Sequence, residues 1–495
     1  MAEEKGKSYS HILKYTSLFG SIQVLNVLVG LVRNKFVALI LGPDGMGLAS
    51  LFNSTIKLFS DTVNLGVPMS GVREVAEAYD SGDIKSLDRA ISSVRMLSML
   101  TAVVGALLCV LLARLLDAWT FGWGNHSLYF VLLAPAIAFT VMAAGETAIV
   151  KGTKQLRSLA RISVYQVFLV LFISVPFYYV WGQAAIVPVI TIVAFTQMVL
   201  TMFVSYRYYS PLLLIRRWKE ENRQGPSMTR KRNISTIRRL VVLGLAFVLS
   251  GIMASGADFL IRAYINNVSR LDDVGFFNSG FVLINMYAGM VFVSMDSDYY
   301  PRLSSVRHGT QAFRDMVSRQ VEVTLLLIAP MLIAMMVLMP IVMPILYSSA
   351  FTPVVSMAQV SLLGIFFRAV YLPVEYIPLS AARSKVYLVQ ESVSALLLAV
   401  FVILGYSLWG LWGAGAGIAM SYLVEMVFVL CLSRRMFGYV LSSDAIKFLL
   451  VHLVLALFAY VCICSDSSVL YWVGGVLCVL VSSAYSLLIM KKTKK

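Results

Sequence analysis

Four polar side chains recur at helical spacing in the otherwise apolar stretch of residues 42–77. In chain order they are Asn53, Lys57, Asp61 and Asn64. At separations of four, four and three residues, a helix would place them along one face. The stretch is long enough to cross a bilayer, and a lysine or an aspartate at that depth is costly unless it faces protein or a water-filled cavity. The stripe therefore predicts either a charged pair that locks two helices together or the wall of a polar passage.

Further cations fall inside apolar spans, although most lysines and arginines of the chain lie in the polar segments between the spans. The candidate cations for a binding cavity are Arg33, Lys35, Lys57, Arg262 and Arg368. Cations around a central cavity would favour an anionic substrate, and arginine suits phosphate oxygens through its bidentate fork. Because Arg33, Lys35 and Arg262 lie near the ends of their spans, snorkelling to the membrane surface is the alternative explanation for those three.

Carboxylates within the spans supply possible coupling to an ion gradient, with H⁺ or Na⁺ as the ion. The candidates are Asp61, Asp258, Glu375 and Glu425. A buried carboxylate is paired, protonated or bound to a cation. Static pairs between Asp258 and Arg262, and between Glu375 and Arg368, are the alternative. The predicted polar lining of the same passage consists of Asn26, Asn53, Asn64 and Asn285.

Composition places these residues in a membrane protein. Hydrophobic residues make up 59% of the 495, charged residues only 13%, and the mean hydropathy is +0.81. A soluble protein of this length would carry about twice that charged fraction. Apolar stretches of bilayer length recur from end to end, so we predict an all-α polytopic membrane protein with about fourteen transmembrane helices. The first is expected to be a retained helix and not a signal peptide, and the second to cover residues 46–72.

Charge sets the predicted orientation. With the N-terminus in the cytoplasm, 34 of the 41 lysines and arginines fall in cytoplasmic segments, and the opposite loops are short and nearly uncharged. The positive-inside rule expects this asymmetry, and an even number of spans places both termini inside. The net charge of +16 is thus explained by topology, and no nucleic-acid partner is inferred.

The longest connection, residues 207–239, carries ten cations and separates two sets of six spans. We therefore expect an N-terminal six-helix lobe at 1–210, a basic cytoplasmic loop at 211–238, a C-terminal six-helix lobe at 239–435, and two additional helices with a basic tail at 436–495. A shift of 228 residues aligns Asp44 and Gly45 with Asp272 and Asp273, and Lys57 with Asn285. Two such lobes would be related by an axis along the membrane normal, with the passage between them.

Signals of an enzyme are weak. The chain has no GxxxxGK[ST] phosphate-binding sequence, and its four histidines and five cysteines lack metal spacing, so no cofactor and no metal is predicted. Residues 296–298 (DSD) imitate the acidic pair of metal-dependent sugar transferases, but a helix-end cap is the favoured interpretation. A membrane-embedded glycan polymerase or transferase would also need a substantial outer loop. The sequence favours a transporter, not an enzyme.

Several motifs together resemble a known family. Residues 41–49 (LGPDGMGLA) resemble the LGPxGxGL turn of Wzx-type flippases, the O-antigen and related lipid-linked oligosaccharide translocases of the multidrug/oligosaccharidyl-lipid/polysaccharide exporter superfamily. Further similar segments are 300–304 (YPRLS), 273–275 (DVG), 351–352 (FT), and 382–387 (ARSKVY) with Glu391. The resemblance covers nearly the whole chain, including the number of spans and the central basic loop.

The resemblance implies an alternating-access carrier that moves undecaprenyl-diphosphate-linked oligosaccharide repeat units from the cytoplasmic to the periplasmic face of the bacterial inner membrane. It implies membrane lipids, and the polysaccharide polymerase and chain-length machinery, as partners. Lys35, Arg262 and Arg368 fall where such flippases tend to carry a basic residue. Alternatives are a lipid II flippase and a multidrug extruder of the same superfamily, and the excess of cations in the spans disfavours the extruder.

Overall fold

The computed structural model describes residues 2–121, 126–210, 248–294, 299–381 and 383–493, and these are helical almost throughout, with no β-strand among them. Ten helical segments are long and apolar enough to cross a membrane, and the segments Arg157–Tyr208 and Ser384–Phe437, of 52 and 54 residues, each have the length of two spans. The predicted all-α polytopic membrane fold is confirmed. The predicted basic loop at 211–238 and the acidic residues 296–298 lie outside the described residues.

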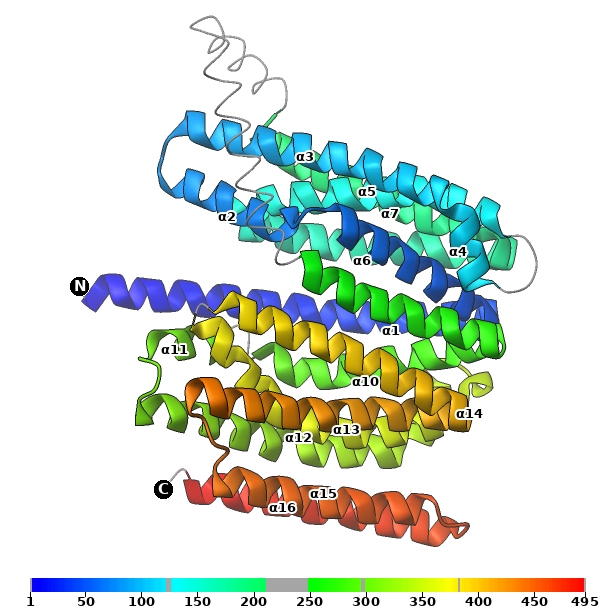
Figure 1. The fold of residues 1–495 in the computed structure, drawn as a ribbon, viewed down its shortest axis with the longest axis vertical. Helices are drawn as coiled ribbons and strands as arrows, with labels where there is room; N and C mark the ends of the chain where they lie inside the picture. Colours follow the sequence, from blue (N-terminus) through cyan, green and yellow to red (C-terminus); the bar gives the residue numbers. More distant parts are fainter. Residues whose placement is uncertain (1, 122–125, 211–247, 295–298, 382, 494–495) are drawn as a thin grey trace, which may run out of the picture. The chain divides into compact units, whose positions relative to one another are not determined.

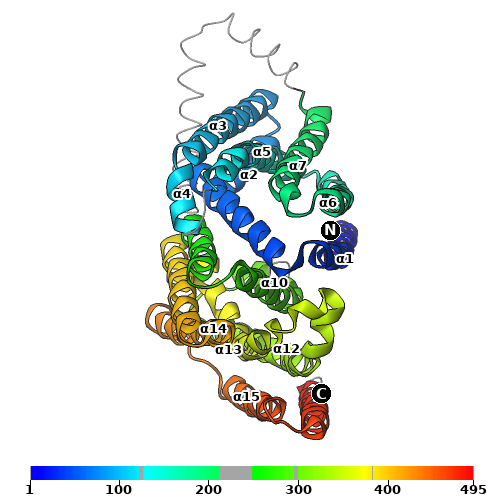
Figure 2. The same cartoon turned by 90° about the vertical axis from the view of Figure 1, so that its right-hand side faces the viewer.

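The chain divides into two compact units, Met1–Phe259 and Leu260–Lys495, which we call the N-terminal and the C-terminal unit. The helices of the N-terminal unit are α1 (Ala2–Val63), α2 (Val67–Asp80), α3 (Ile84–Leu111), α4 (Ala113–Thr120), α5 (Ser127–Gly152), α6 (Leu156–Trp181), the short η1 (Gly182–Ala185) and α7 (Ile186–Tyr208). Helix α5 packs against α2, α3 and α7 (Figure 2). The first part of a further helix, Val248–Val268, also belongs to this unit. The expected lobe boundaries at 210 and 239 stay predictions.

Helix α1 contains a sharp turn at Gly42, the glycine of the LGPDGMGLA segment. Gly42 has φ 70° and ψ −175°, a conformation that residues with a Cβ rarely adopt. Pro43 follows it and fits the first turn of the continuing helix, where its missing N–H has no partner to lose. The Asp44 carboxylate accepts a hydrogen bond of 2.5 Å from the Gln183 amide in η1. The segment therefore reverses the chain and joins that reversal to the turn between α6 and α7.

The expected span at 46–72 is interrupted, because α1 ends at Val63 and α2 begins only at Val67. The side-chain oxygen of Asn64 accepts a hydrogen bond of 2.8 Å from the Gly66 amide. Gly66 precedes α2 with φ 73°, in the left-handed region. Asparagine competes for backbone amides in this way at turns, which is why a pattern that looked continuous ends here.

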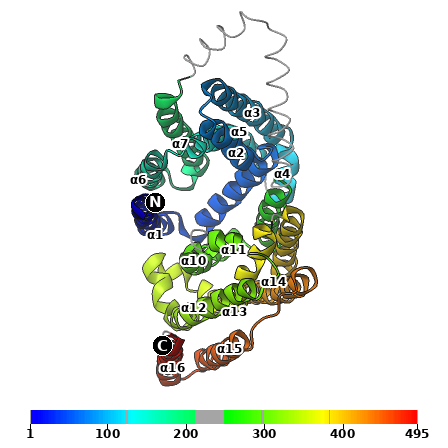
Figure 3. The ribbon, with the colours of Figure 1, turned by 90° about the vertical axis from the view of Figure 1, so that its left-hand side faces the viewer.

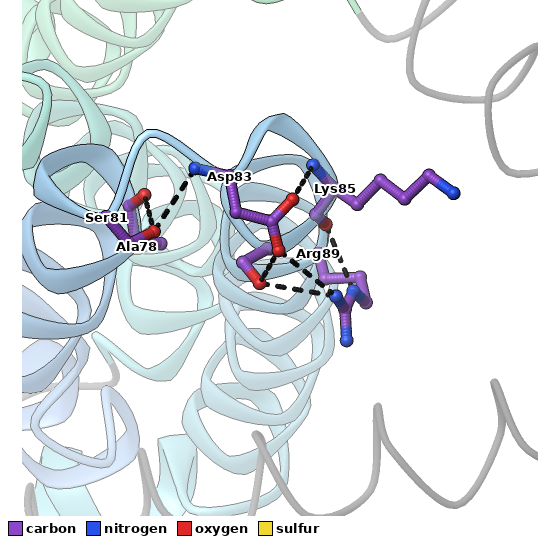
Figure 4. A network of polar contacts seen from close by, with 6 residues as sticks. Ala78, Ser81, Asp83, Lys85 and Arg89 are labelled. Carbon is purple, nitrogen blue, oxygen red and sulfur yellow. Dashed lines mark hydrogen bonds and ion pairs between the residues drawn. The ribbon is translucent and has the colours of Figure 1, made fainter.

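The turn between α2 and α3 is held by Asp83 (Figure 4). Its carboxylate accepts hydrogen bonds of 3.0 Å from the Lys85 amide and 2.6 Å from the Ser86 hydroxyl, which makes it the N-cap of α3. The Arg89 guanidinium lies 4.0 Å away. These contacts, the Ser86 hydroxyl first, hold the pKa of the exposed Asp83 carboxyl below its usual value.

We expect the first turn of α3 to loosen in acid. A lowered folded-state pKa means that the ionised cap contributes stability above the unfolded pKa of about 4, and that the contribution is lost as pH falls through the folded pKa. Hydrogen exchange of residues 84–87, corrected for intrinsic rates, should therefore accelerate below about pH 4. Asp83→Asn keeps a capping side chain that does not titrate, and its exchange should lack this pH dependence. The same acid response in Asp83→Asn would contradict the prediction.

The C-terminal unit contains the remaining helices. They are the second part of Val248–Val268, α10 (Leu271–Ser294), α11 (Tyr300–Ser305), α12 (Gln311–Leu346), η3 (Ser349–Phe351), α13 (Val354–Ser380), α14 (Ser384–Phe437), α15 (Ser443–Ile463), η4 (Leu470–Gly474) and α16 (Gly475–Thr493). Helix α13 packs against α10, α12 and α14, and Figure 3 shows it between α12 and α14. It is the centre of this unit, since 72% of the residues in its most apolar 18-residue stretch are buried.

Helix α14 is a hairpin of two spans that reverses at Trp409 and Gly410, where Gly410 has φ 61° and ψ −141°. Glycines let its two arms approach closely. A Cβ added to Gly413 would collide with the Gly405 backbone, and one added to Gly417 would collide with the Phe401 backbone. A small residue at every fourth position is a common way to pack helices in a membrane.

The reversals of the two units match under the 228-residue shift. The shift places Trp181 on Trp409 and Gly182 on Gly410. Gly182 has φ 56° and ψ −135°, close to the values of Gly410. Two separate turns thus share a sequence pair and a backbone conformation, as expected if the two lobes are similar to each other.

Helix α12 continues through Pro340, and side chains from other elements bond to the carbonyls of the turn before it. Proline has no N–H for the carbonyl four residues earlier and crowds the preceding turn. The Met336 carbonyl instead accepts a hydrogen bond of 3.0 Å from the Gln359 amide of α13, and the Val337 carbonyl accepts one of 3.0 Å from the Tyr471 hydroxyl in η4. The last two helices, α15 and α16, run side by side (Figure 1). Both pack on α12, the helix that receives these two hydrogen bonds.

Candidate functional site

Arg368, one of the predicted cations, lies in α13 among neutral polar and aromatic groups. Its Nη1 donates hydrogen bonds of 2.8 Å to the Asn285 side-chain oxygen of α10 and 3.3 Å to the Tyr422 hydroxyl of α14. The guanidinium lies 5.6 Å from the ring centroid of Phe292 and 5.4 Å from that of Tyr422. Such contacts orient an arginine without neutralising it.

Two carboxylates act on this arginine electrostatically, and a third acts on those two. Glu375 of α13 and Glu425 of α14 are 7% and 2% exposed, and both act electrostatically on Arg368. Glu391, on the other arm of α14, acts on both of them. Glu425 interacts with Tyr371 and Ser394 as well. Among the described residues no ion pair within 4.0 Å joins Glu375 to Arg368, although the two interact electrostatically, and the alternative of a static pair stays a prediction.

Arg262 is almost fully buried, at 5% exposure, in the part of its helix that belongs to the C-terminal unit. Its Nη2 donates a hydrogen bond of 3.0 Å to the Asn278 side-chain oxygen of α10, and its guanidinium lies 5.8 Å from the centroid of the Phe277 ring. These contacts hold the charged end of Arg262 against α10, and the snorkelling alternative stays a prediction. The predicted pairing with Asp258 stays a prediction.

In the N-terminal unit, three members of the polar stripe lie on one helix face. Asn53 and Lys57 are exposed, and Asp61 is half-buried. The Asn53 amide donates to the Ala49 carbonyl of its own helix at 2.7 Å. Asp61 interacts electrostatically with Lys57 and lies near Ser255 of the helix Val248–Val268, whose hydroxyl donates a hydrogen bond of 2.7 Å to the Gly251 carbonyl. Asn64 does not line a passage as part of this helix, because it terminates it.

The first half of α1 carries the other predicted residues of this unit. Arg33 is half-buried and interacts electrostatically with the buried Tyr178 of α6. The Nε atom of Arg33 and the side-chain oxygen of Asn26 are both buried without a hydrogen-bond partner among the described residues. Lys35 is half-buried as well. Buried polar atoms without protein partners are usually satisfied by water or by a ligand.

The structure also contains polar groups that the sequence interpretation missed. Arg95 of α3 makes a two-pronged ion pair with Glu146 of α5, at 2.8 and 3.2 Å. Glu146 lies in an apolar span, which is the signal that could have found it. Gln390 of α14 is 1% exposed, and neither of its terminal atoms has a hydrogen-bond partner in the described part of the chain. Gln390 is therefore a further buried polar group of α14 that the sequence interpretation did not include.

Each unit therefore brings some predicted residues together. In the C-terminal unit Arg368 contacts Asn285 and interacts with Glu375 and Glu425. In the N-terminal unit Lys57 interacts with Asp61. The role of these residues in substrate binding or ion coupling stays a prediction, and so does the convergence of Lys57, Arg262 and Arg368 on one ligand.

Solved structures define the class of fold. The chain is similar to lipid II flippase MurJ in an inward closed conformation, with a TM-score of 0.63 and 14% identity over 97% of this chain and 100% of that one. It is also similar to an inward-facing multidrug resistance MATE family transporter of the MOP superfamily (TM-score 0.60, 15% identity, 85% and 98% coverage). A third match is a mutant of the Vibrio cholerae MATE transporter VcmN (TM-score 0.59, 11% identity, 88% and 98% coverage). The chain shares its fold with these solved structures.

Sequence comparison gives the family. Residues 12–307, more than half of the chain, match the model of the polysaccharide biosynthesis protein family. The chain belongs to that family. No curated protein sequence matches it.

Proposed function

We propose that this protein is a flippase for undecaprenyl-diphosphate-linked oligosaccharide repeat units, the precursors of O-antigen, capsule or a related surface polysaccharide. The observation that carries the proposal is Arg368, a cation within a membrane span whose hydrogen-bond partners are neutral. Such an arginine keeps its positive charge available for an anion. Membership in the polysaccharide biosynthesis protein family and a fold shared with transporters support a lipid-linked precursor as that anion.

In the proposed mechanism, the diphosphate pairs with Lys57, Arg262 and Arg368 while the lipid tail remains in the bilayer. Lys35 and Arg33 add positive charge, and Asn26, Asn53 and Asn285 offer hydrogen bonds to diphosphate or sugar. Alternation between inward-open and outward-open states then carries the polar head across. No step breaks a covalent bond, so the protein acts as a transporter and not as an enzyme.

An ion gradient would reset the carrier. Glu375 and Glu425 are buried carboxylates near Arg368, and binding of H⁺ or Na⁺ would change the net charge beside the diphosphate. Asp61 and Asp258 are the corresponding candidates of the N-terminal unit. The proposed location is the bacterial inner membrane with both termini in the cytoplasm, where the polysaccharide polymerase and chain-length machinery would act with it.

Two alternatives share the fold. A lipid II flippase is favoured by the match to MurJ, which covers 97% of this chain. The substrate of a lipid II flippase is also a polyprenyl diphosphate, so the same cations would bind its diphosphate. A multidrug extruder is supported by the MATE matches, but a cationic drug would not be drawn to arginines and lysines.

Complementation of a strain that lacks its own repeat-unit flippase tests the proposal. We expect the wild-type protein to restore surface glycan, and Arg368→Ala or Arg262→Ala to reduce it at least tenfold, because a hydrogen bond to a charged group contributes about 1.5–3 kcal/mol. Arg368→Lys keeps the charge without the fork and should retain part of the activity. Arg114→Ala, at an exposed position of α4, is the matched control and should behave as wild type.

All variants are compared at equal membrane abundance and equal melting temperature. Full activity of Arg368→Ala and Arg262→Ala would refute the cationic site. Rescue of a strain depleted of its lipid II flippase, without rescue of the repeat-unit strain, would favour the lipid II alternative. Drug resistance conferred without either rescue would favour the extruder.

A further inference from the structure

A second basic site lies away from the groups discussed above, where α11 meets the first turns of α12. A cavity of about 500 Å³ is lined there by Arg302 of α11 and by Ala312, Asp315, Met316, Arg319, Gln320 and Val323 of α12. Among the described residues, the Arg319 guanidinium makes no ion pair. The neighbouring carboxylate of Asp315 instead accepts a hydrogen bond of 2.8 Å from the Gln311 amide. The cavity is thus lined by two arginines and by one carboxylate, which accepts a hydrogen bond from Gln311.

The α12 surface that leaves this cavity is apolar. Val323, at the edge of the cavity, is 44% exposed. Leu327 and Met331 follow at intervals of four residues on the same helix face, at 44% and 36% exposure. Because α12 is long and apolar enough to cross a membrane, this stripe is suited to contact acyl chains. A cationic cavity is therefore continuous with a lipid-facing surface.

We propose that this cavity binds the phosphate of a membrane phospholipid, with the acyl chains lying along Val323, Leu327 and Met331. Arg302 and Arg319 carry the guanidinium groups that match phosphate oxygens. The Asp315 carboxylate faces the same cavity and suits an ammonium or hydroxyl group at the far end of a phospholipid headgroup. A volume of about 500 Å³ is in the range of small-ligand pockets. The site binds lipid whether or not the protein translocates diphosphate-linked sugars.

The test measures lipid retention by the full-length protein in detergent with native mass spectrometry. The probe is dimyristoyl phosphatidylglycerol, compared with dimyristoylglycerol, which lacks the phosphate, and with inorganic phosphate, which lacks the chains. We expect Arg319→Gln to weaken phosphatidylglycerol binding about tenfold, the value of one charge-assisted hydrogen bond. Val323→Asp, at the start of the stripe, should weaken it as well.

The matched control is Arg314→Gln, an exposed arginine of the same helix about 140° around its axis and not part of the cavity lining. It should leave binding unchanged. Equal losses in Arg314→Gln and Arg319→Gln would mean non-specific attraction and would overturn the site. Equal retention of dimyristoylglycerol would overturn the role of the phosphate, and equally tight binding of inorganic phosphate would overturn the lipid as its source.

Polyprenyl diphosphate is the remaining probe. If polyprenyl diphosphate binds at the Arg319 site more weakly than phosphatidylglycerol does, the result supports a resident phospholipid. Displacement of phosphatidylglycerol at equimolar polyprenyl diphosphate, lost in Arg319→Gln, would instead make this a site for the proposed substrate and would overturn the phospholipid assignment.

Discussion

Replacing Arg95 by alanine should destabilise the N-terminal unit by about 3–5 kcal/mol, the usual cost of breaking a buried ion pair by removing one partner. Arg95 and Glu146 have side-chain exposures of 14% and 4%. The guanidinium also donates 2.8 Å to the Tyr209 carbonyl and 3.1 Å to the Ser205 hydroxyl, and lies 4.5 Å from the Tyr206 ring centroid. One side chain thus ties α3 to α5 and to the end of α7. Its loss leaves the Glu146 carboxylate buried without a counter-ion.

The measurement is the melting temperature of the detergent-solubilised full chain, with unfolding free energies from denaturant titration where the transition is reversible. Arg73→Ala is the control, because Arg73 and Glu77 form an ion pair at 66% and 50% exposure on α2. Exposed helix pairs contribute about 0.3–0.5 kcal/mol, so that variant should melt close to wild type. Joint replacement, Arg95→Met with Glu146→Leu, should recover much of the loss. Similar melting of Arg95→Ala and Arg73→Ala would disprove the prediction.

Adding a methyl group to Gly413 should separate the arms of the α14 hairpin. The Cβ of Gly413→Ala would meet the Gly405 backbone, which cannot rotate away as a side chain can, and would lie 3.0 Å from the Trp409 Cβ. Overpacking of this kind costs about 1–3 kcal/mol. Because one arm of α14 carries Glu391 and the other carries Tyr422 and Glu425, we also expect lower transport activity.

Gly30→Ala is the matched control, since a Cβ added there has nothing within 4 Å. The same substitution at that position should be neutral or stabilising by up to about 1 kcal/mol through helix propensity. Thermal melting of the two variants side by side separates local overpacking from the general effect of replacing glycine in a membrane helix. Equal melting temperatures would contradict close packing of the hairpin.

Much of the architecture followed from composition and periodicity alone. Hydropathy and charge predicted the polytopic helical fold because spans must satisfy every backbone hydrogen bond internally, which leaves long apolar helices as a clear pattern. The turn at Gly42 was indicated by the resemblance of residues 41–49 to the LGPxGxGL turn, not by composition or periodicity. The interruption at Asn64 was not predicted, because Val63, Leu65 and Val67 continue the apolar character through the turn.

The sequence predicts individual residues of the candidate site but not the contacts between them. Arg368 and Asn285 were each selected for polarity inside a span, but their 2.8 Å hydrogen bond joins residues 83 positions apart, and no spacing rule reports such a contact. Glu391 enters the sequence interpretation only through the family resemblance, and no pattern in the sequence points to Gln390. Arg319 was counted among the cations explained by orientation. Tertiary packing, not periodicity, decides which of these side chains share a cavity.

The two hydrogen bonds to the α12 carbonyls before Pro340 form at different times during translation. Tyr471 and Val337, which share a hydrogen bond, are 134 residues apart. At synthesis rates of about 5–20 residues per second, the Val337 carbonyl waits roughly ten seconds for its hydroxyl partner after it leaves the ribosome. Gln359, only 23 residues beyond Met336, arrives within seconds. A nascent chain halted before η4 therefore has the Gln359 hydrogen bond to Met336 but lacks the Tyr471 hydrogen bond to Val337. The second bond can form only after translation has passed η4.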